Sequence, residues 1–202
     1  MSKHLFLASQ SPRRLELLRQ IGIEPTVLPL RAASERHDVD ETPLAGETAM
    51  DYVARLARLK MEAATRAQLC RKLPAWPLLA ADTTVTLDGE ILGKPADAEN
   101  AAAMLRRYSG RAHTVLTAVA GSFLGRTRVA LSESVVTFKS LSEREIAAYV
   151  AATEYYGKAG GYAIQGRAAM FVCHLAGSYS GVMGLPLYET AELLQSVGFE
   201  PS

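Results

Sequence analysis

The sequence predicts a mixed α/β fold, in which helices pack on a twisted sheet of parallel and antiparallel strands. Three observations predict it. Short apolar runs alternate with amphipathic segments along the chain. Asp88-Gly89 joins residues 84–87 to residues 90–92, a pattern typical of an antiparallel hairpin. The 202 residues, 49% of them hydrophobic, suit one globular domain of two lobes, or two small domains.

Charge and composition exclude several classes of protein. Lys and Arg number 22 and Asp and Glu 21, so the net charge of +1 provides no strong basic field to attract nucleic acid. Cys70 and Cys173, without a CxxC motif, favour a reducing cytosol, and we expect both to be buried without a chemical role. The four histidines lack zinc-ligand spacing. No apolar run suits a signal peptide or a membrane span, so we expect a soluble, cytoplasmic protein.

The first predicted strand and helix bring two arginines together. Residues 5–8 form an apolar strand, and residues 12–20 a helix with Ser11 as its N-cap. Arg13 and Arg14 lie in the first helical turn, where the helix dipole disfavours positive charge. Either both side chains extend into water, or a bound anion makes positive charge favourable at this position. The strand–turn–helix setting favours the anion.

The next segments supply carboxylates and a further cation. A strand predicted over residues 26–30 is followed by an acid-rich loop, which contains residues 35–41 and ends near Pro43 and Gly46. Such a loop is normally solvated, but its carboxylates would also suit a hard metal ion. In the long helix predicted over residues 47–68, Lys60 falls inside the apolar stripe. It either extends along the surface to water or binds phosphate.

An acid and a lysine flank the predicted hairpin. Residues 78–81 are an apolar run that predicts a short buried strand, with Asp82 at its carboxyl end. Counting outward from the two-residue turn pairs Thr83 with Lys94, so the acid enters the hairpin close to where the lysine leaves it. Taken alone, these charges would be ordinary solvated residues at strand ends.

The remaining chain continues the mixed pattern. We expect helices over residues 98–108 and 143–150 and after Pro186, and strands over residues 115–120, 129–138 and 169–175. A glycine-rich stretch, residues 157–166, lies between them, and its glycines would let the backbone approach a ligand closely.

Cations and carboxylates from these segments are candidates for a single site. The cations are Arg13, Arg14, Lys60 and Lys94, with Lys158 as a further member, and the carboxylates are Asp82 and Glu41, with Asp40 as a further member. In phosphoryl chemistry, cations bind phosphate oxygens, while carboxylates hold Mg²⁺ or Mn²⁺ or orient a water. The chain has no GxxxxGK[ST] or GxSxG motif, which argues against a Walker-type NTPase and against acyl transfer.

Six stretches of the chain resemble the motifs of the Maf family of nucleoside triphosphate pyrophosphatases, in the family's order. They are residues 7–18 (LASQSPRRLELL), 52–60 (YVARLARLK), 81–83 (ADT), 93–95 (GKP), 158–166 (KAGGYAIQG) and 182–186 (VMGLP). The resemblance implies one domain over residues 1–202, with a deep cleft between two lobes, and a homodimer. It also implies cleavage of a nucleoside triphosphate between the α and β phosphates with a divalent cation, Mg²⁺ or Mn²⁺.

Carried onto matching positions, the resemblance implies roles for individual residues. Asp82 would act as acid/base on the water that attacks the α-phosphorus, and Asp82 and Glu41 would hold the metal or the water. The phosphate ligands would be Ser9, Arg13, Arg14, Lys60 and Lys94. Arg13, Thr83 and Gln165 match positions tied to base selectivity.

The stretch around Gln165 resembles the branch of the family that acts on dTTP and UTP. The branch that acts on 7-methyl-GTP typically has an acidic residue there, whereas a Gln amide offers the donor and acceptor that match a pyrimidine imide. Leu59 departs from the family, which usually has Glu before the helix lysine. Two alternatives stay open: broader removal of modified pyrimidine nucleotides, since a shallow pocket need not reject a small added group, and a nucleotide-binding regulator of cell division.

Overall fold

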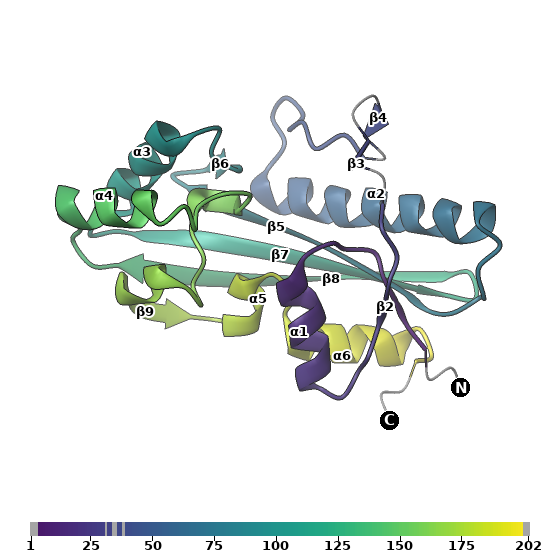
Figure 1. Cartoon of the computed structure of the whole chain (residues 1–202). Coiled ribbons are helices and arrows are strands. Elements are labelled where there is room, and N and C mark those ends of the chain that lie inside the picture. Colours follow the sequence, from purple (N-terminus) through teal and green to yellow (C-terminus); the bar gives the residue numbers. More distant parts are fainter. Residues whose placement is uncertain (1–3, 31, 34–35, 38, 200–202) are drawn as a thin grey trace.

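The computed structural model describes residues 4–30, 32–33, 36–37 and 39–199 and confirms the mixed α/β fold. Among these residues, seven strands form one sheet in the order β2-β1-β5-β7-β8-β9, with β6 paired to β5 beside this path (Figure 1). The pairs β1–β2 and β1–β5 are parallel and the other pairs are antiparallel. A separate antiparallel pair joins β3 and β4.

The elements have the following bounds. The strands are β1 (Phe6–Leu7), β2 (Thr26–Val27), β3 (Ala32–Ala33), β4 (Arg36–His37), β5 (Leu78–Leu87), β6 (Glu90–Leu92), β7 (Ala112–Phe123), β8 (Arg126–Phe138) and β9 (Val172–Ala176). The α-helices are α1 (Pro12–Gln20), α2 (Ala49–Cys70), α3 (Ala98–Tyr108), α4 (Glu143–Ala151), α5 (Tyr179–Met183) and α6 (Leu187–Ser196). Two 3₁₀ turns, η1 (Ala159–Gly161) and η2 (Arg167–Met170), lie between α4 and β9.

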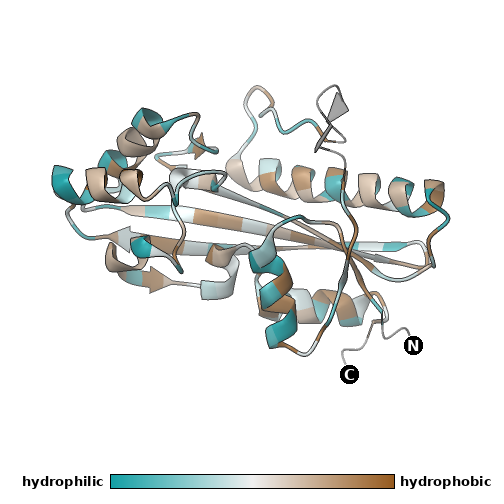
Figure 2. Ribbon diagram, viewed as in Figure 1, coloured by the Kyte–Doolittle hydropathy of each residue, from teal (hydrophilic) through white to brown (hydrophobic). Residues whose placement is uncertain are grey.

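Helices cover both faces of the sheet, and each face has its own core. On one face, α2 packs its apolar stripe against alternate residues of β5 and β7, with Val53 and Ala57 touching the cluster that contains Ala80 and Ala118. On the other face lie α1, α3, α4 and α6, around a larger cluster. Figure 1 shows α2 above the sheet and α1 and α6 below it, and Figure 2 shows hydrophobic residues recurring along these elements.

Local sequence signals predict several elements correctly. The helix expected over residues 12–20 is α1, with proline at its start. Asp97 and Ser142 cap α3 and α4 through their side chains, and Ser142 forms a capping box with Glu145. The hairpin turn is also confirmed, because Leu87 pairs with Glu90 across Asp88-Gly89.

The strand that carries Asp82 is longer than predicted. Instead of ending at residue 81, β5 continues without a break to Leu87, so Asp82 lies in the middle of the strand and not at its carboxyl end. The reason is non-local: β7 pairs with β5 from Leu78 to Thr86 and holds it extended throughout. The pairing of β5 with β6 ends at Leu92, so the expected pair of Thr83 with Lys94 is not formed.

Other expectations need correction. Cys70 and Cys173 are exposed, not buried. The strand expected over residues 169–175 is a 3₁₀ turn followed by β9, and the short helix α5 was not predicted. The strand expected over residues 26–30 is limited to β2. Of the acid-rich loop, Glu35 and Asp38 lie outside the described residues. Within the described part of the chain, no helix combines the length and the apolarity that a bilayer crossing requires.

Candidate active site

The candidate site lies at a gap along one edge of β5. The strand β1 pairs with this edge as far as Leu79, and β6 pairs with the same edge over residues 85–87. Among the described residues, β5 residues 80–84 have a strand partner only on the β7 side. Alternate strand residues point their N–H and C=O groups to the same edge, and the Leu79 carbonyl already accepts from the segment after β1. The main-chain groups of Ala81 and Thr83 therefore point into the gap.

A cavity of about 500 Å³ opens at this gap. Its lining comes from α1 and the turn before it, α2, β5, β7, the segment after β6, the glycine-rich stretch and α5. The polar and charged side chains in the lining are Ser9, Gln10, Ser11, Arg13, Arg14, Lys60, Asp82, Thr83, Lys94, Lys158 and Tyr162. Because successive β5 residues face opposite sides of the sheet, Asp82 approaches from the α2 face and Thr83 from the α1 face. The gap thus lets both faces contribute to one cavity.

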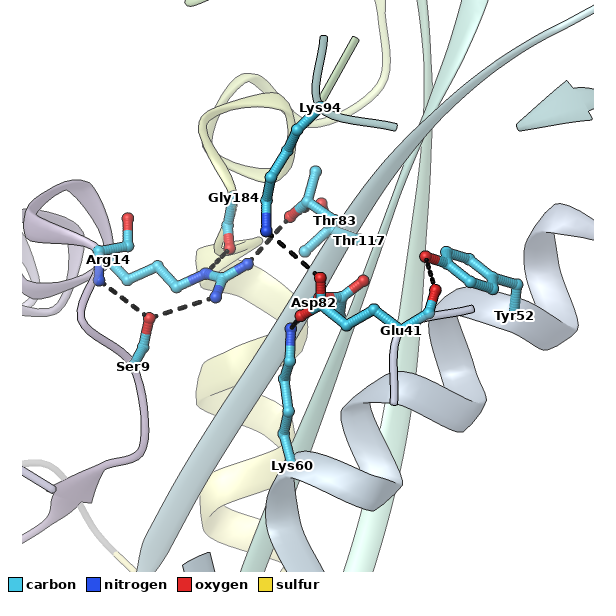
Figure 3. Close-up of polar contacts among 11 residues, drawn as sticks. Ser9, Arg14, Glu41, Tyr52, Lys60, Asp82, Thr83, Lys94, Thr117 and Gly184 are labelled. Carbon is cyan, nitrogen blue, oxygen red and sulfur yellow. Dashed lines mark hydrogen bonds and ion pairs between the residues drawn. The ribbon is translucent and has the colours of Figure 1, made fainter. Parts of the chain in front are cut away.

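Lys60 lies between two carboxylates (Figure 3). Its Nζ atom is 2.5 Å from Asp82 Oδ1 and 2.7 Å from Glu41 Oε1. Lys94 Nζ lies 3.3 Å from the other oxygen of Glu41. Burial alone would raise the pKa of Glu41, but Lys60 and Lys94 outweigh it, and the pKa lies below its ordinary value. Glu41 is therefore ionised at neutral pH. The lysine that the sequence placed in an apolar stripe has its charge balanced by acids.

Arg14 is held by three acceptors from three parts of the chain. Its Nε donates to the Gly184 carbonyl at 2.7 Å, Nη1 to Ser9 Oγ at 3.2 Å and Nη2 to Thr83 Oγ1 at 3.2 Å. Burial lowers the pKa of the guanidinium, and the charge of Asp82 partly opposes this shift. A guanidinium has five N–H donors, so two remain for a ligand. The alternative that both arginines extend into water is wrong for Arg14.

Two further cations are unpaired. Among the described residues, Arg13 and Lys158 have no ion-pair or hydrogen-bond partner for their side chains, although both line the cavity. Burial lowers the pKa of both groups, and for Lys158 the nearby charge of Arg13 lowers it further. Two partly desolvated positive charges without a counter-ion are favourable only when an anion joins them. The cavity is therefore electrostatically suited to a polyanion.

Most of the predicted site residues lie together. Seven of them line the cavity: Ser9, Arg13, Arg14, Lys60, Asp82, Thr83 and Lys94. Glu41 is joined to this group through Lys60 and Lys94. Gln165 is exposed and is not part of the cavity lining. Thr117, beside Thr83, was missed, although a threonine within the apolar run 115–120 is the kind of buried polar residue that needs a partner.

The two carboxylates fit a divalent cation that a phosphate helps to hold. No group of three or more His, Cys, Asp or Glu side chains suited to a metal occurs among the described residues. Mg²⁺, however, commonly takes only one or two protein carboxylates and completes its shell with water and substrate phosphates. Asp82 and Glu41 meet that requirement, since Lys60 bridges them and brings their oxygens to the same place. Together with the cations, they could bind a metal-bound polyphosphate and activate a water.

The chain matches known proteins over almost its full length. A family model described as "Maf-like protein" matches residues 4–197. A protein of Ralstonia nicotianae named "dTTP/UTP pyrophosphatase" is 57% identical over 95% of this chain and 92% of its own. Proteins with the same name from Nitrosomonas europaea and Dechloromonas aromatica are 53% and 54% identical, over 96% and 98% of this chain and 94% and 98% of their own.

One solved structure also aligns with this one, more distantly. Titled "The structure of the Staphylococcus aureus Ham1 protein", it covers 67% of this chain and 71% of its own, with a TM-score of 0.44 and 20% identity. The assignment of a family rests instead on the family model and on the relatives that share half or more of their residues with this chain. On these grounds, the chain belongs to the Maf family.

Proposed function

We propose that this protein hydrolyses dTTP and UTP between the α and β phosphates, releasing the nucleoside monophosphate and pyrophosphate. The observation that carries the proposal is the cavity at the β5 gap, in which cations from distant segments surround Asp82. Such a cavity can neutralise a triphosphate while a carboxylate lies beside the phosphorus that reacts. The names of the relatives, three of which are more than 50% identical over nearly the whole chain, support the substrate.

In this proposal, the cations of the cavity bind the phosphate chain. Arg13, Arg14, Lys60 and Lys94 donate to phosphate oxygens. The Ser9 hydroxyl joins them: its oxygen already accepts from Arg14 Nη1 and from Ser11 N, so its own proton is free to be donated. Binding the phosphates in fixed positions aligns the α-phosphorus for attack and neutralises the charge that develops on the leaving pyrophosphate.

Asp82 accepts the proton of the attacking water. Its side chain is mostly buried, and it lies on a central strand that is paired along its length with β7, so its position is well defined. A divalent cation, Mg²⁺ or Mn²⁺, would be held by Asp82 and Glu41 and would supply charge neutralisation at the phosphates. Lys60, which contacts both carboxylates, keeps them in place before the substrate arrives.

We propose that the base is selected by Thr83, Arg13 and Gln165. Thr83 and Arg13 line the cavity directly. Gln165 is exposed and follows Ile164 at the end of the glycine-rich stretch, so it would contact a base that projects toward that side of the cavity. Its amide can donate to one imide oxygen or accept from the imide N–H.

A panel of triphosphates tests the proposal. Purified protein is incubated with Mg²⁺ and separately with dTTP, UTP, CTP, GTP, 7-methyl-GTP and 5-substituted UTP analogues, and pyrophosphate is measured. We expect dTTP and UTP to have the highest kcat/KM. Equal or higher kcat/KM for the 5-substituted analogues would indicate the broader removal of modified pyrimidines. Binding of nucleotides without release of pyrophosphate would indicate a regulator and contradict the proposal.

We propose that the protein acts in the cytoplasm on free nucleotides, as a homodimer, and that neither nucleic acid nor a membrane is a partner. The small net charge of +1 agrees with a small-molecule substrate rather than a nucleic acid.

A further inference from the structure

A chain of hydrogen bonds runs from Arg14 through two threonines to α5. Arg14 Nη2 is 3.2 Å from Thr83 Oγ1, and Thr83 Oγ1 is 2.9 Å from Thr117 Oγ1. Thr117 Oγ1 in turn lies 2.8 Å from the carbonyl oxygen of Gly181. The two threonines face each other directly, because they are register partners on β5 and β7 (Figure 3). Thr117 is 1% exposed and does not line the cavity.

Counting protons gives every bond in this chain a direction. A carbonyl only accepts, so the single proton of Thr117 is donated to Gly181. Thr117 can then only accept from Thr83, which must donate its own proton to Thr117. A guanidinium only donates, so Thr83 accepts from Arg14. All donors thus point the same way, from the cavity toward α5.

We propose that Thr117 is a positioning residue for nucleotide binding. By taking the proton of Thr83, it fixes the Thr83 hydroxyl as an acceptor, and this acceptor holds one arm of the Arg14 guanidinium. Without Thr117 as its acceptor, Thr83 would turn its proton to other partners, including the region that Arg14 Nη2 occupies. Thr117 touches no ligand, and it acts through Thr83.

The same contacts couple Arg14 to α5 at a second point. Arg14 Nε donates to the Gly184 carbonyl, and Gly184 has a φ of 115°, which L side chains rarely adopt. A Cβ at Gly184 would lie 3.5 Å from Thr83 Oγ1 and 3.6 Å from Arg14 Nε, so the backbone packs directly against the pair. The Thr83–Thr117 hydrogen-bond chain therefore positions the Arg14 guanidinium from one side and Gly184 positions it from the other. This leaves the guanidinium little freedom to turn.

A double-mutant cycle tests this inference, which rests on the proposed function for its choice of ligand. The measured quantity is the Kd of α,β-methylene-UTP with Mg²⁺, determined by calorimetry on the full chain, because this analogue binds without being cleaved between its α and β phosphates. The variants are Thr117→Val, Thr83→Val, their combination and Thr117→Ser. Thr190→Val is the matched control, since Thr190 is a fully buried threonine on α6 whose hydroxyl has no hydrogen-bond partner.

We expect Thr117→Val to raise Kd about 10-fold. This is the effect expected when one hydrogen bond of a charged group, here that of Arg14 to Thr83, is weakened. In the Thr83→Val background the same change should raise Kd less than about 3-fold, because the hydroxyl through which Thr117 acts is absent. Thr117→Ser keeps the hydroxyl and should restore binding to within about 3-fold of the unchanged chain, and Thr190→Val should bind normally.

Two results would overturn the inference. One is normal binding by Thr117→Val. The other is an equal rise in Kd in both backgrounds, which would assign Thr117 a general structural role through Gly181. Thermal melting checks that each variant folds. If Thr117→Val does not, Thr117→Cys replaces it in the cycle, with a smaller expected rise in Kd because a thiol, unlike valine, still donates and accepts weakly. Failure of the proposed function would appear separately, as no release of pyrophosphate from UTP by the unchanged chain.

Discussion

Lys60 shows how a charged residue is accommodated on the inner face of a helix. Its side chain is 17% exposed, and its ammonium contacts both Glu41 and Asp82. Burying an unpaired ammonium is strongly unfavourable, whereas a pair with satisfied partners roughly offsets the cost. In the proposed complex, phosphate oxygens and a metal ion join the same three groups. In this proposal, the free protein keeps Asp82 paired with Lys60, the residue that later contacts the substrate.

Replacing Asp82 separates binding from chemistry. We expect Asp82→Asn to lower kcat for UTP at least about 10²-fold, the usual scale for removing a general base, because an amide cannot accept the proton of the attacking water. Binding of α,β-methylene-UTP should persist, since the cations remain. Steady-state kinetics and calorimetry measure the two quantities.

The matched control for this variant is Asp88→Asn. Asp88 lies in the turn of the same hairpin, is exposed and pairs with Arg111. Asparagine tolerates the positive φ of 54° found there, so this variant should keep full activity. Turnover of Asp82→Asn at the rate of Asp88→Asn would reject the role given to Asp82.

His113 makes the stability of the fold depend on pH. The ring is 3% exposed, and Nε2 lies 2.8 Å from the hydroxyl of Tyr162. Burial lowers its pKa from 6.5 to about 4. His113 is therefore protonated below about pH 6.5 in the unfolded chain, but only below about pH 4 in the folded chain. The stability from this group is complete above pH 6.5 and is lost as the pH falls through that window.

We expect the free energy of unfolding to fall by about 2 kcal/mol between pH 7.5 and pH 5 because of His113. Urea unfolding of the unchanged chain and of His113→Gln at both values of pH measures this contribution as the difference between the two pH dependences. The glutamine variant should lose less stability on acidification. The same loss in both proteins would show that His113 is not the responsible group.

At the scale of single residues, the sequence predicts the chemistry better than the geometry. Residue types and spacing identify Arg14, Lys60 and Asp82 as members of one site, because a cation in an apolar stripe or at a helix N-terminus needs an explanation. They do not identify Thr117, whose function depends on its register with Thr83 across two strands that are 34 residues apart at that point. Such partners are set by tertiary pairing.

At the scale of elements, the glycine-rich stretch packs against the hairpin with one part and lines the cavity with another. Gly160 is buried, and its N–H donates to the Gly93 carbonyl after β6, so this part of the stretch approaches the hairpin. A Cβ at Gly160 would lie 2.6 Å from Val85 Cγ2 and 3.0 Å from the Tyr108 hydroxyl. Gly157, by contrast, lines the cavity, as expected.

We expect Gly160→Ala to destabilise the protein by about 2–4 kcal/mol, since a left-handed backbone and an overpacked contact both add cost. Gly125→Ala is the control: its φ of 78° is similar to the 69° of Gly160, but no atom would lie within 4 Å of its Cβ. It should lose only about 1–2 kcal/mol, for the backbone alone. Urea denaturation compares the two, and equal losses would mean that the contact with Val85 is not tight.

Elements with strong local signals are predicted well, and those set by pairing are not. Side-chain caps fix the starts of α3 and α4, Pro12 fits the first turn of α1, where Ser11 forms no side-chain cap, and Asp88-Gly89 fixes the hairpin, because these signals act within a few residues. The length of β5 and the gap along its edge depend on where β1, β6 and β7 pair with it. No local pattern encodes that gap, although it creates the cavity.

At the scale of the whole molecule, the cavity depends on segments from both faces of one sheet. Arg14 reaches it from α1 and Lys60 from α2, on opposite sides of β5. We propose that residues 1–202 form a single domain, since the sheet is continuous and both cores share its central strands. The position of the site at the edge between the two faces explains how residues from 9 to 184 can meet one small ligand.

The most direct test of this account is the fate of water oxygen during turnover. UTP is hydrolysed by the unchanged chain with Mg²⁺ in ¹⁸O-labelled water, and the products are analysed by ³¹P NMR and mass spectrometry. Water activated by Asp82 at the α-phosphorus predicts labelled UMP and unlabelled pyrophosphate. Label in the pyrophosphate, or release of UDP and inorganic phosphate, would contradict it.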